Sequence, residues 1–381
     1  MKIDVCIVVL SWHPEEGVFT GGGFRRSVEI IRVFARREKL VVIDSRPSIF
    51  HDISPAPGVQ VLEYSLPRLD RLARHTVRPA RAIQWALAFA NLVRLGRTAL
   101  SSHPTAVLYV PTAEILPCAL AGVVLKFLTG SRLVMCNQNI QDIFARKLVL
   151  ALHARSDVVT TVSRVAAASL KAAGLDAPIV ITGNAAPEVQ DSIGPGVPGK
   201  RWEGVFIGRH TSGKGIFDVL DIWERVVARS PDARLLLIGP SSPDIDRRIN
   251  ARCSRSTLLR HRVFKAGVAS DLRKLNFLQA SRVLLAPSRA ETWGFVPAEA
   301  VAVGVPVVCW DLPAYEESLP NVHLVTKIRV GDVDAFASAV LRHLVESPPP
   351  HRVHEEERNA APSWQEIARR EWSVIVGSPA E

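Results

Sequence analysis

The feature that most constrains this sequence is a regular alternation of short β-branched runs with longer helical patterns. A first series of strands is expected at residues 5–10, 39–44, 59–64, 106–110, 132–136 and 158–162. A second series is expected at residues 202–208, 233–239, 261–267, 283–288, 306–310 and 322–326. Helical patterns such as 27–37 and 164–174 separate the strands, and this alternation predicts parallel sheets with helices on both faces.

The two series are separated by a stretch rich in glycine and proline. Residues 186–202 lack periodicity and are the best linker in the chain. A chain of 381 residues is also too long for one typical core. We therefore expect two doubly wound α/β domains, residues 1–185 and 186–362, followed after a proline-rich break by an isolated amphipathic helix within 363–381. Ligands of such sheets bind beyond the carboxyl ends of the strands.

Composition is typical of a soluble α/β enzyme, with 48% hydrophobic and 22% charged residues. The longest apolar runs, at 123–128 and 283–287, are far shorter than the roughly 18 residues that span a bilayer. The N-terminal run predicts a first strand better than a signal peptide. Five cysteines at positions 6, 118, 136, 253 and 309 show no paired spacing. We expect reduced thiols in a cytoplasmic protein, with neither zinc nor disulfides.

The positive charge of the chain is concentrated in its first half. Residues 1–185 hold 22 Lys and Arg against 13 Asp and Glu, whereas the remainder holds 25 against 24. The excess predicts an acidic partner for the N-terminal half. Helical spacing would place five arginines on one face, with Pro79 kinking or ending the helix: Arg68, Arg71, Arg74, Arg78 and Arg81. We interpret this face as a contact with the anionic inner surface of a membrane, or alternatively as a solvated helix. Nucleic acid is not expected, because no aromatic platform accompanies the charge.

A glycine-rich loop, GRHTSGKG at 208–215, directly follows the expected strand at 202–208. Arg209 and Lys214 place two positive charges where a helix begins, and a helix N-terminus already favours anions. The loop is not a P-loop, because Gly215 stands where that motif has Ser or Thr. It indicates a diphosphate cradle; a solvated turn is the alternative.

The stretch ETWGFVPAEA at 291–300 carries two carboxylates between apolar runs. Pro297 suits a first helical position, which would put Glu299 in the first helical turn and Glu291 in the preceding loop. Both carboxylates would then converge on one hydroxyl-rich ligand. The alternative is that Glu299 complements the helix dipole and Glu291 is solvated. Of the two Asp-x-Asp sequences, 244–246 and 332–334, the second is expected to cap a helix, and no metal is expected.

Together these motifs resemble the retaining glycosyltransferases of the GT-B fold, family four. The resemblance is densest in GRHTSGKG, in residues 264–288 and in residues 291–317, and it is weaker at 20–37, 156–170, 181–187 and the terminal helix. It implies two Rossmann-like domains that face a cleft, with the last helix crossing back to the N-terminal domain. It also implies a nucleotide-sugar donor carrying UDP, GDP or ADP, with no cofactor.

The resemblance also assigns roles to individual residues. Arg209 and Lys214 would bind the donor diphosphate, Glu291 the sugar hydroxyls and Glu299 the ribose. Further donor contacts would come from a strand end beside the base, from amides at a helix start and from an N-terminal glycine loop: Phe264, Lys265, Gly294, Phe295, Val296, Gly21, Gly22 and Gly23. Arg209, Lys214 and Glu291 are the catalytic candidates, acting by positioning and electrostatics without a protein nucleophile.

The acceptor side departs from the family pattern. Many relatives have a histidine at the end of an N-terminal-domain strand, where this chain has Asn137, Gln138 and Asn139. These amides and His13 are the acceptor-side candidates. The acceptor would be a lipid-linked or envelope glycan, placing the protein in polysaccharide or glycolipid biosynthesis. Alternatives are a nucleotide-sugar epimerase or phosphorylase on the same scaffold, and a non-catalytic sugar-nucleotide-binding subunit. The sequence does not specify the sugar, the base, the acceptor or the oligomeric state.

Overall fold

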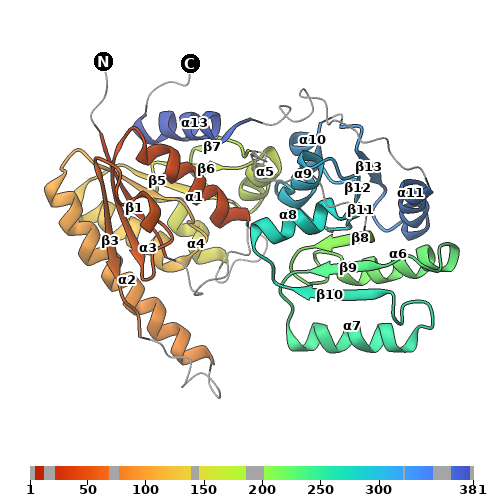
Figure 1. Cartoon of the computed structure of the whole chain (residues 1–381). Helices are drawn as coiled ribbons and strands as arrows, with labels where there is room; N and C mark the ends of the chain where they lie inside the picture. The colour runs from red at the N-terminus through yellow and green to blue at the C-terminus, as the bar shows by residue number, and fades with distance from the viewer. Residues whose placement is uncertain are drawn as a thin grey trace. The chain divides into compact units, whose positions relative to one another are not determined.

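The chain divides into two compact units, residues 1–184 with 364–381 (unit 1) and residues 185–363 (unit 2). A computed structural model describes residues 5–12, 22–67, 77–138, 146–185, 201–320, 322–345 and 362–377 (Figure 1). Most of the expected linker, residues 186–200, lies outside this described part. Each unit is built around one parallel sheet.

Unit 1 contains a seven-stranded parallel sheet in the order β3-β2-β1-β4-β5-β6-β7. Its strands are β1 (Cys6–Leu10), β2 (Lys39–Ser45), β3 (Val59–Tyr64), β4 (Val107–Val110), β5 (Leu133–Asn137), β6 (Val158–Thr161) and β7 (Ile179–Ile181). Strand β1 pairs with β2 on one side and β4 on the other, with Val8 opposite Val41 and Leu108. The central strands are buried on both faces, which explains their continuous apolar runs.

The helices of unit 1 are α1 (Gly22–Ala35), α2 (Val77–Ser102), α3 (Leu116–Thr129), α4 (Arg146–His153), α5 (Arg164–Ala172) and α13 (Trp364–Val376), with a short 3-10 turn η1 (His51–Ile53). Helices α2 and α3 pack together on one face of the sheet. Helices α1 and α13 pack against each other, and the ring of Phe34 in α1 contacts both Tyr109 of β4 and Trp372 of α13. The terminal helix therefore belongs to the layer that covers the sheet.

Unit 2 contains a six-stranded parallel sheet in the order β10-β9-β8-β11-β12-β13. The strands are β8 (Trp202–Ile207), β9 (Leu235–Ile238), β10 (Val263–Gly267), β11 (Ser281–Ala286), β12 (Val307–Trp310) and β13 (Val325–Ile328). The helices are α6 (Ile216–Arg229), α7 (Pro243–Arg255), α8 (Asp271–Gln279), α9 (Phe295–Ala302), α10 (Ala314–Ser318) and α11 (Val333–Val345). By chain order within the unit, the strands run 3-2-1-4-5-6, the order of doubly wound Rossmann sheets.

The core of unit 2 depends on tight helix-to-sheet contacts. Trp223 of α6 is fully buried over Gly204 of β8, where a Cβ atom would lie 2.5 Å from the indole ring. Trp310 of β12 makes an edge contact with Phe336 of α11, with ring centroids 4.8 Å apart. Any side chain larger than hydrogen at position 204 would push α6 off the sheet.

Several expectations from the sequence are confirmed or corrected at this level. The alternating pattern correctly predicts parallel sheets, but β7 was not expected. Helix α2 begins at Val77, so Pro79 lies in its first turn and neither ends nor kinks it. All five cysteines are free, and no helix in the described ranges is long and apolar enough to cross a bilayer.

Candidate functional site

The strand order of unit 2 places its candidate site at the junction of β8 and β11. These neighbouring strands are parallel, so the loops that follow them, 208–215 and 287–294, leave the same edge of the sheet. Chain connections diverge to opposite sides at this point, which is where ligands of open α/β sheets bind. The amide of Arg289 donates to the carbonyl of Gly213 at 2.9 Å, so the two loops are joined directly.

The contact between the loops requires a glycine. Gly215 has φ 75° and caps helix α6, and a Cβ atom there would lie 2.0 Å from the carbonyl oxygen of Pro287. That separation is far inside van der Waals contact, and the positive φ already disfavours other residues. The sequence GRHTSGKG can therefore lie against the loop after β11 only because its last residue is glycine.

Lys214 and Glu291 meet across this junction. The Lys214 Nζ atom lies 2.6 Å from Glu291 Oε1, and the two side chains are 28% and 14% exposed. Each residue comes from a different loop, so the pair exists only in the folded sheet. Arg209 lies on the same loop as Lys214 and is exposed. The cation and the carboxylate that the sequence singled out are brought together, within reach of solvent.

Glu299 is held by a second ion pair, which the sequence did not reveal. Its side chain is only 2% exposed, and its Oε1 accepts from Lys274 Nζ at 2.6 Å. Lys274 lies on α8 and also pairs with Asp271 at 3.0 Å. Helix α9 begins at Phe295, so Pro297 is its third residue and Glu299 lies in its second turn, which corrects the expected first-turn position.

Between the two glutamates, Gly294 caps helix α9 with φ 95°. A Cβ atom there would lie 2.5 Å from Cε1 of Tyr315, a buried residue of α10. Burial, and then the nearby charge of Glu291, raise the pKa of Tyr315 well above its usual value. Phe295 and Val296 follow Gly294 as the first two residues of the helix, where amide groups point out of the helix start.

Phe264 and Lys265 lie within β10 and do not form its carboxyl end, which is at Gly267; this corrects the expected strand end. The ring of Phe264 packs on Trp202, the first residue of β8, with centroids 5.2 Å apart. Lys265 Nζ contacts Asp246 Oδ1 at 3.2 Å and Asn250 Oδ1 at 3.0 Å, both on α7. In this structure neither side chain contacts the two glutamates.

Several candidates of unit 1 cannot be placed: His13, Gly21 and Asn139 lie outside the described residues. Gly22 and Gly23 are the first two residues of α1. Gln138 follows β5 and is buried, with its Nε2 donating to Ser27 Oγ at 3.2 Å and to Pro111 O at 3.1 Å. The backbone N–H of Gln138 donates to the carboxylate of Glu114.

Asn137, the last residue of β5, is paired with a histidine that the sequence reasoning overlooked. Its Nδ2 lies 3.2 Å from Nε2 of His153, whose Nδ1 lies 2.7 Å from the carbonyl of Val149. Burial lowers the pKa of His153 to about 4. The ring is therefore neutral at pH 7, with Nδ1–H donating and Nε2 accepting, which fixes the orientation of the Asn137 amide.

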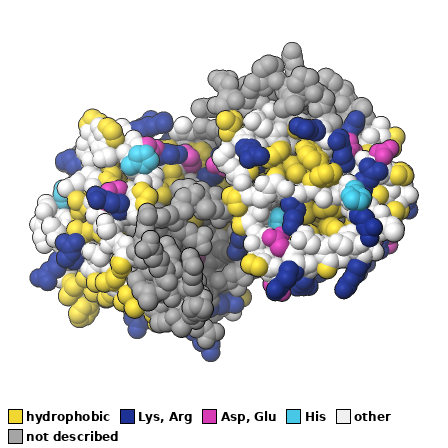
Figure 2. Space-filling view, turned by 60° about the horizontal axis from the view of Figure 1, so that its bottom comes forward, with side chains coloured by type: hydrophobic (Ala, Val, Ile, Leu, Met, Phe, Trp, Pro, Cys, Tyr) yellow, Lys and Arg dark blue, Asp and Glu magenta, His cyan; other side chains and the backbone are white. Residues whose placement is uncertain are grey.

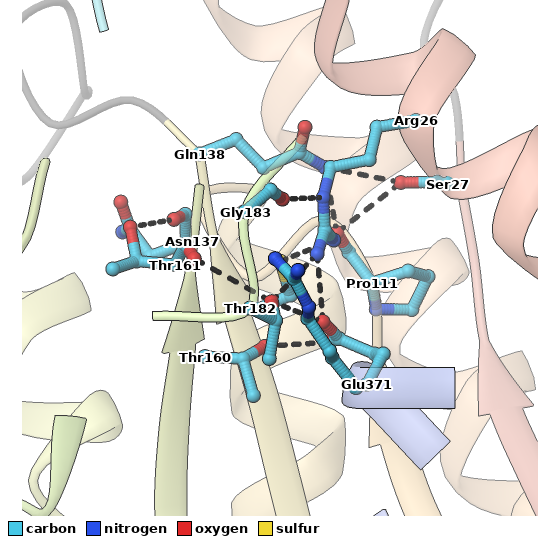
Figure 3. A network of polar contacts seen from close by, with 12 residues as sticks. Arg26, Ser27, Pro111, Asn137, Gln138, Thr160, Thr161, Thr182, Gly183 and Glu371 are labelled. Atoms are coloured by element: carbon cyan, nitrogen blue, oxygen red, sulfur yellow. Dashed lines mark hydrogen bonds and ion pairs between the residues drawn. The ribbon is translucent and has the colours of Figure 1, made fainter. Parts of the chain in front are cut away.

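A buried ion pair joins the start of α1 to α13 at the carboxyl edge of the unit 1 sheet (Figure 3). Arg26 Nη2 lies 2.7 Å from Glu371 Oε2, and both side chains are fully buried. Arg26 also donates to Thr182 Oγ1 at 2.8 Å and to the carbonyl of Gly183 at 3.2 Å. Glu371 further accepts from the hydroxyls of Thr160 and Thr182 at 2.5 Å each and from that of Tyr109 at 2.9 Å.

The charge state of this pair follows from its contacts. Burial alone would raise the pKa of Glu371. The guanidinium of Arg26 and the hydroxyl donors Thr160 and Thr182 outweigh burial, so the pKa is lowered and the residue is ionised at neutral pH. The network crosses from β6 and β7 to two helices, and it fixes the ends of the strands that lie beside Asn137 and Gln138.

No cluster of side chains within the described ranges has the composition of a metal site. Of the two Asp-x-Asp sequences, Asp332 acts as a helix cap, as expected: its Oδ1 accepts from the amide of Ala335 at 2.9 Å, at the start of α11. Asp246 of the other sequence is paired with Lys265.

Comparison with known proteins finds similarity in unit 2. Residues 203–346 match the family model Glycosyl transferases group 1. Over 174 residues the chain is 29% identical to the phosphatidyl-myo-inositol mannosyltransferase of Mycobacterium tuberculosis, covering 45% of this chain and 44% of that protein. The Mycolicibacterium smegmatis protein of the same name is 30% identical over 139 residues, covering 36% and 34%. The chain thus matches less than half the length of these curated relatives.

Solved structures extend the likeness to the whole fold. The complex of Anabaena HepE with UDP and glucose has a TM-score of 0.66 at 17% identity, covering 97% of this chain and 95% of that one. Sucrose-phosphate synthase from Thermosynechococcus elongatus has a TM-score of 0.71 at 17% identity, covering 98% of both chains. The fold is GT-B, as the sequence predicts, with two Rossmann-like units and a terminal helix on the first.

Proposed function

We propose that this protein is a glycosyltransferase that moves a sugar from a nucleotide-sugar donor to an acceptor hydroxyl. Residues 186–362 would form the donor domain and residues 1–185 the acceptor side, with 363–381 completing the latter. The observation that carries the proposal is the Lys214–Glu291 pair, which lies at the switch point of a Rossmann sheet. The family match over residues 203–346 supports it.

The donor would replace the contacts that these residues make with each other. Lys214 is directed at a carboxylate 2.6 Å away, so an incoming diphosphate can take over the same cation. Glu291 is then released to accept hydrogen bonds from sugar hydroxyls, and Glu299, fixed by Lys274, accepts them from the ribose. Arg209 adds a second charge for the diphosphate. As the diphosphate leaves, positive charge placed before the reaction stabilises the negative charge that develops.

We further propose that transfer retains the anomeric configuration and requires no metal. The cations Arg209 and Lys214 supply the charge that a metal would otherwise provide, and Glu291, once released from Lys214, binds sugar hydroxyls instead of acting as a nucleophile. Proton NMR of the first product formed distinguishes retention from inversion. Full activity after treatment with EDTA is expected, and loss of activity that Mg²⁺ or Mn²⁺ restores would refute metal independence.

The donor assignment is tested by thermal shift with UDP-, GDP- and ADP-sugars, because a ligand that binds only the native state stabilises it. We expect one nucleotide class to raise the melting temperature, and we expect Lys214→Ala and Glu299→Ala to diminish the shift. Lys171→Ala, in an exposed part of α5 in unit 1, is the matched control and should respond as the unaltered protein does. No shift with any donor, or equal shifts with all of them, would refute the assignment.

The acceptor is proposed to be lipid-linked and reached from an anionic membrane surface on the cytoplasmic side. The relatives named above are phosphatidyl-myo-inositol mannosyltransferases. Arg68, Arg71 and Arg74 lie outside the described residues, as do the side chains of Arg78 and Arg81 at the start of α2. Farther along α2, a groove of ≈ 610 Å³ against α3 is lined by both arginine and apolar side chains, including Arg94, Arg97 and Leu128.

Beside this groove, Phe127 is 88% exposed and Leu128 is 54% exposed. Exposed apolar groups flanked by arginines suit the boundary between lipid headgroups and acyl chains. On the face shown in Figure 2, Lys and Arg side chains are scattered among hydrophobic ones and form no single block. Sedimentation with anionic vesicles should carry the protein down, and Phe127→Ser and the pair Arg94→Gln with Arg97→Gln should weaken it. Arg255→Gln in unit 2 is the control. Equal sedimentation with zwitterionic vesicles would refute the proposal.

A further inference from the structure

A second pocket opens beside the loop after β8, between that loop and the one after β9. Its volume is ≈ 270 Å³, and its walls are residues 209–212 on one side and residues 240–242 with Ile245 on the other. The two loops are held in register, because the amide of His210 donates to the carbonyl of Pro240 at 2.8 Å and His210 forms an isolated parallel bridge with Ser241. Both walls belong to unit 2, so the pocket is complete within it.

His210 is the unusual member of this lining. Its side chain is only 3% exposed, and its ring lies 5.9 Å from that of Phe206. Among the residues that the structure describes, neither Nδ1 nor Nε2 has a hydrogen-bond partner. A buried polar group without a partner costs about 1–3 kcal/mol. A ligand that hydrogen-bonds to the ring would remove this penalty. The unpartnered histidine therefore indicates that the pocket binds a polar ligand.

The other groups around the pocket favour an anion. Arg209 contributes a guanidinium, and Thr211, Ser212 and Ser241 contribute hydroxyl groups. Helix α7 begins at Pro243, directly after the lining residue Ser242, so its positive end faces the same space. The charged groups near His210 are Asp246 on α7 and Lys265 on β10. They pair with each other at 3.2 Å, so the carboxylate is largely neutralised.

We propose that this pocket binds a tetrahedral oxyanion, a phosphate group, with His210 donating a hydrogen bond to it from the buried wall. The pocket adjoins Arg209 and lies on the same loop as Lys214, so one source of the phosphate is the donor diphosphate. The other source is a separate phosphate-bearing molecule. The identity of the natural ligand rests on the proposed function, whereas the ability of the pocket to bind an anion does not.

Binding of the anion should be coupled to protonation of the ring. Burial lowers the pKa of His210; the charge of Asp246 raises it in part and that of Lys265 lowers it, and the net shift is downward, so the ring is neutral at pH 7. An anion in the pocket favours the charged form and raises that pKa. Affinity for the anion therefore rises as pH falls, because the complex takes up a proton that the empty site does not hold.

Sulfate is the sharpest probe, because it remains a dianion throughout the range in which histidine titrates. We expect sulfate, measured at constant ionic strength against chloride, to bind about fivefold more tightly at pH 6 than at pH 8. The ¹⁵N resonances of the His210 ring should shift on titration. His210→Gln should lose the pH dependence, and Arg209→Gln should weaken binding at both pH values. His323→Gln, at an exposed site of the same unit, is the control.

Absence of sulfate binding, or an unchanged pH dependence in His210→Gln, overturns the proposal. If His210→Gln folds poorly, the ¹⁵N resonances of the His210 ring in the unaltered protein decide whether sulfate binds in this pocket. Sulfate that binds elsewhere would leave these resonances unchanged. Competition with UDP and GDP then identifies the source of the phosphate. Mutual exclusion identifies the donor diphosphate, whereas simultaneous binding identifies a separate phosphate. If the donor panel fails while sulfate binds, only the proposed function is lost.

Discussion

Replacing Glu371 by glutamine tests whether the buried ion pair holds unit 1 together. The substitution preserves the size of the side chain and removes its charge. Arg26 would then be a fully buried cation with only neutral acceptors, which are the new amide oxygen, the Thr182 hydroxyl and the Gly183 carbonyl, and with a weak contact to the sulfur of Cys136. Removing one partner of a buried pair in this way costs about 3–5 kcal/mol.

The loss should be confined to unit 1, because every contact of the network lies in that unit. Urea unfolding monitored by hydrogen exchange with mass spectrometry separates the two units. For a slope of about 2–3 kcal/mol per molar urea, the midpoint of unit 1 should fall by about 1–2 M. Peptides from β8–β13 should exchange as before. Glu366→Gln, at an exposed position of the same helix, should change the midpoint little.

A double replacement separates the charge effect from lost packing. Arg26→Met with Glu371→Leu removes both charges, and apolar substitutes for a buried pair are often neutral or stabilising. We expect the double variant to be more stable than Glu371→Gln. A Glu371→Gln variant within about 1 kcal/mol of the unaltered protein, or a double variant as unstable as the sum of its single changes, would refute the reasoning.

Three other changes test the remaining contacts. Gly294→Ala should destabilise unit 2 by about 1–3 kcal/mol in urea unfolding, because its φ is 95° and its Cβ would lie 2.5 Å from Tyr315; an unchanged midpoint would contradict this. Lys274→Met should lower the stability of unit 2 by about 3 kcal/mol, since it leaves the buried carboxylate of Glu299 without its ammonium partner; hydrogen exchange of α9 measures it, and unaltered protection would exclude it. Burial lowers the pKa of His153 from 6.5 to about 4. The free energy of unfolding should therefore fall by about 3 kcal/mol as pH falls across that interval, because the unfolded chain binds the proton first. His153→Gln should show a flatter pH dependence, and parallel curves would disprove the assignment.

Local patterns predicted the elements of the fold better than they predicted its contacts. Strands buried on both faces appear as apolar runs, so most were evident, but β7 has only three residues, two of them exposed. The helix after Gly294 was expected to begin at Pro297, because proline suits a first turn. The left-handed conformation of Gly294 in fact allows the helix to begin two residues earlier. About half a turn of helix therefore depends on a single backbone conformation, that of Gly294.

The candidate site shows the same limit. Lys214 and Glu291 were predicted because each lies in a glycine-bearing loop after a strand, where chemistry is expected. Lys274 was not, because its pairing with Glu299 depends on how α8 packs against α9. Glu371 lies in an amphipathic pattern in which it resembles a solvated residue. It is buried because Arg26 and the hydroxyl groups of three residues of the sheet region lie opposite, namely Tyr109, Thr160 and Thr182. Side-chain pairs between distant segments carry no local signal.

The pairing of Arg26 with Glu371 also sets the order in which the protein can be completed during synthesis. The two residues are 345 positions apart, and the whole of unit 2 lies between them in the chain. On the ribosome, unit 2 can close its own core while unit 1 still lacks the helix that neutralises Arg26. The unit that begins first is therefore finished last. A chain that stops anywhere before α13 retains a cation with no carboxylate in the interior of its first sheet, so incomplete products should be selectively exposed to proteases.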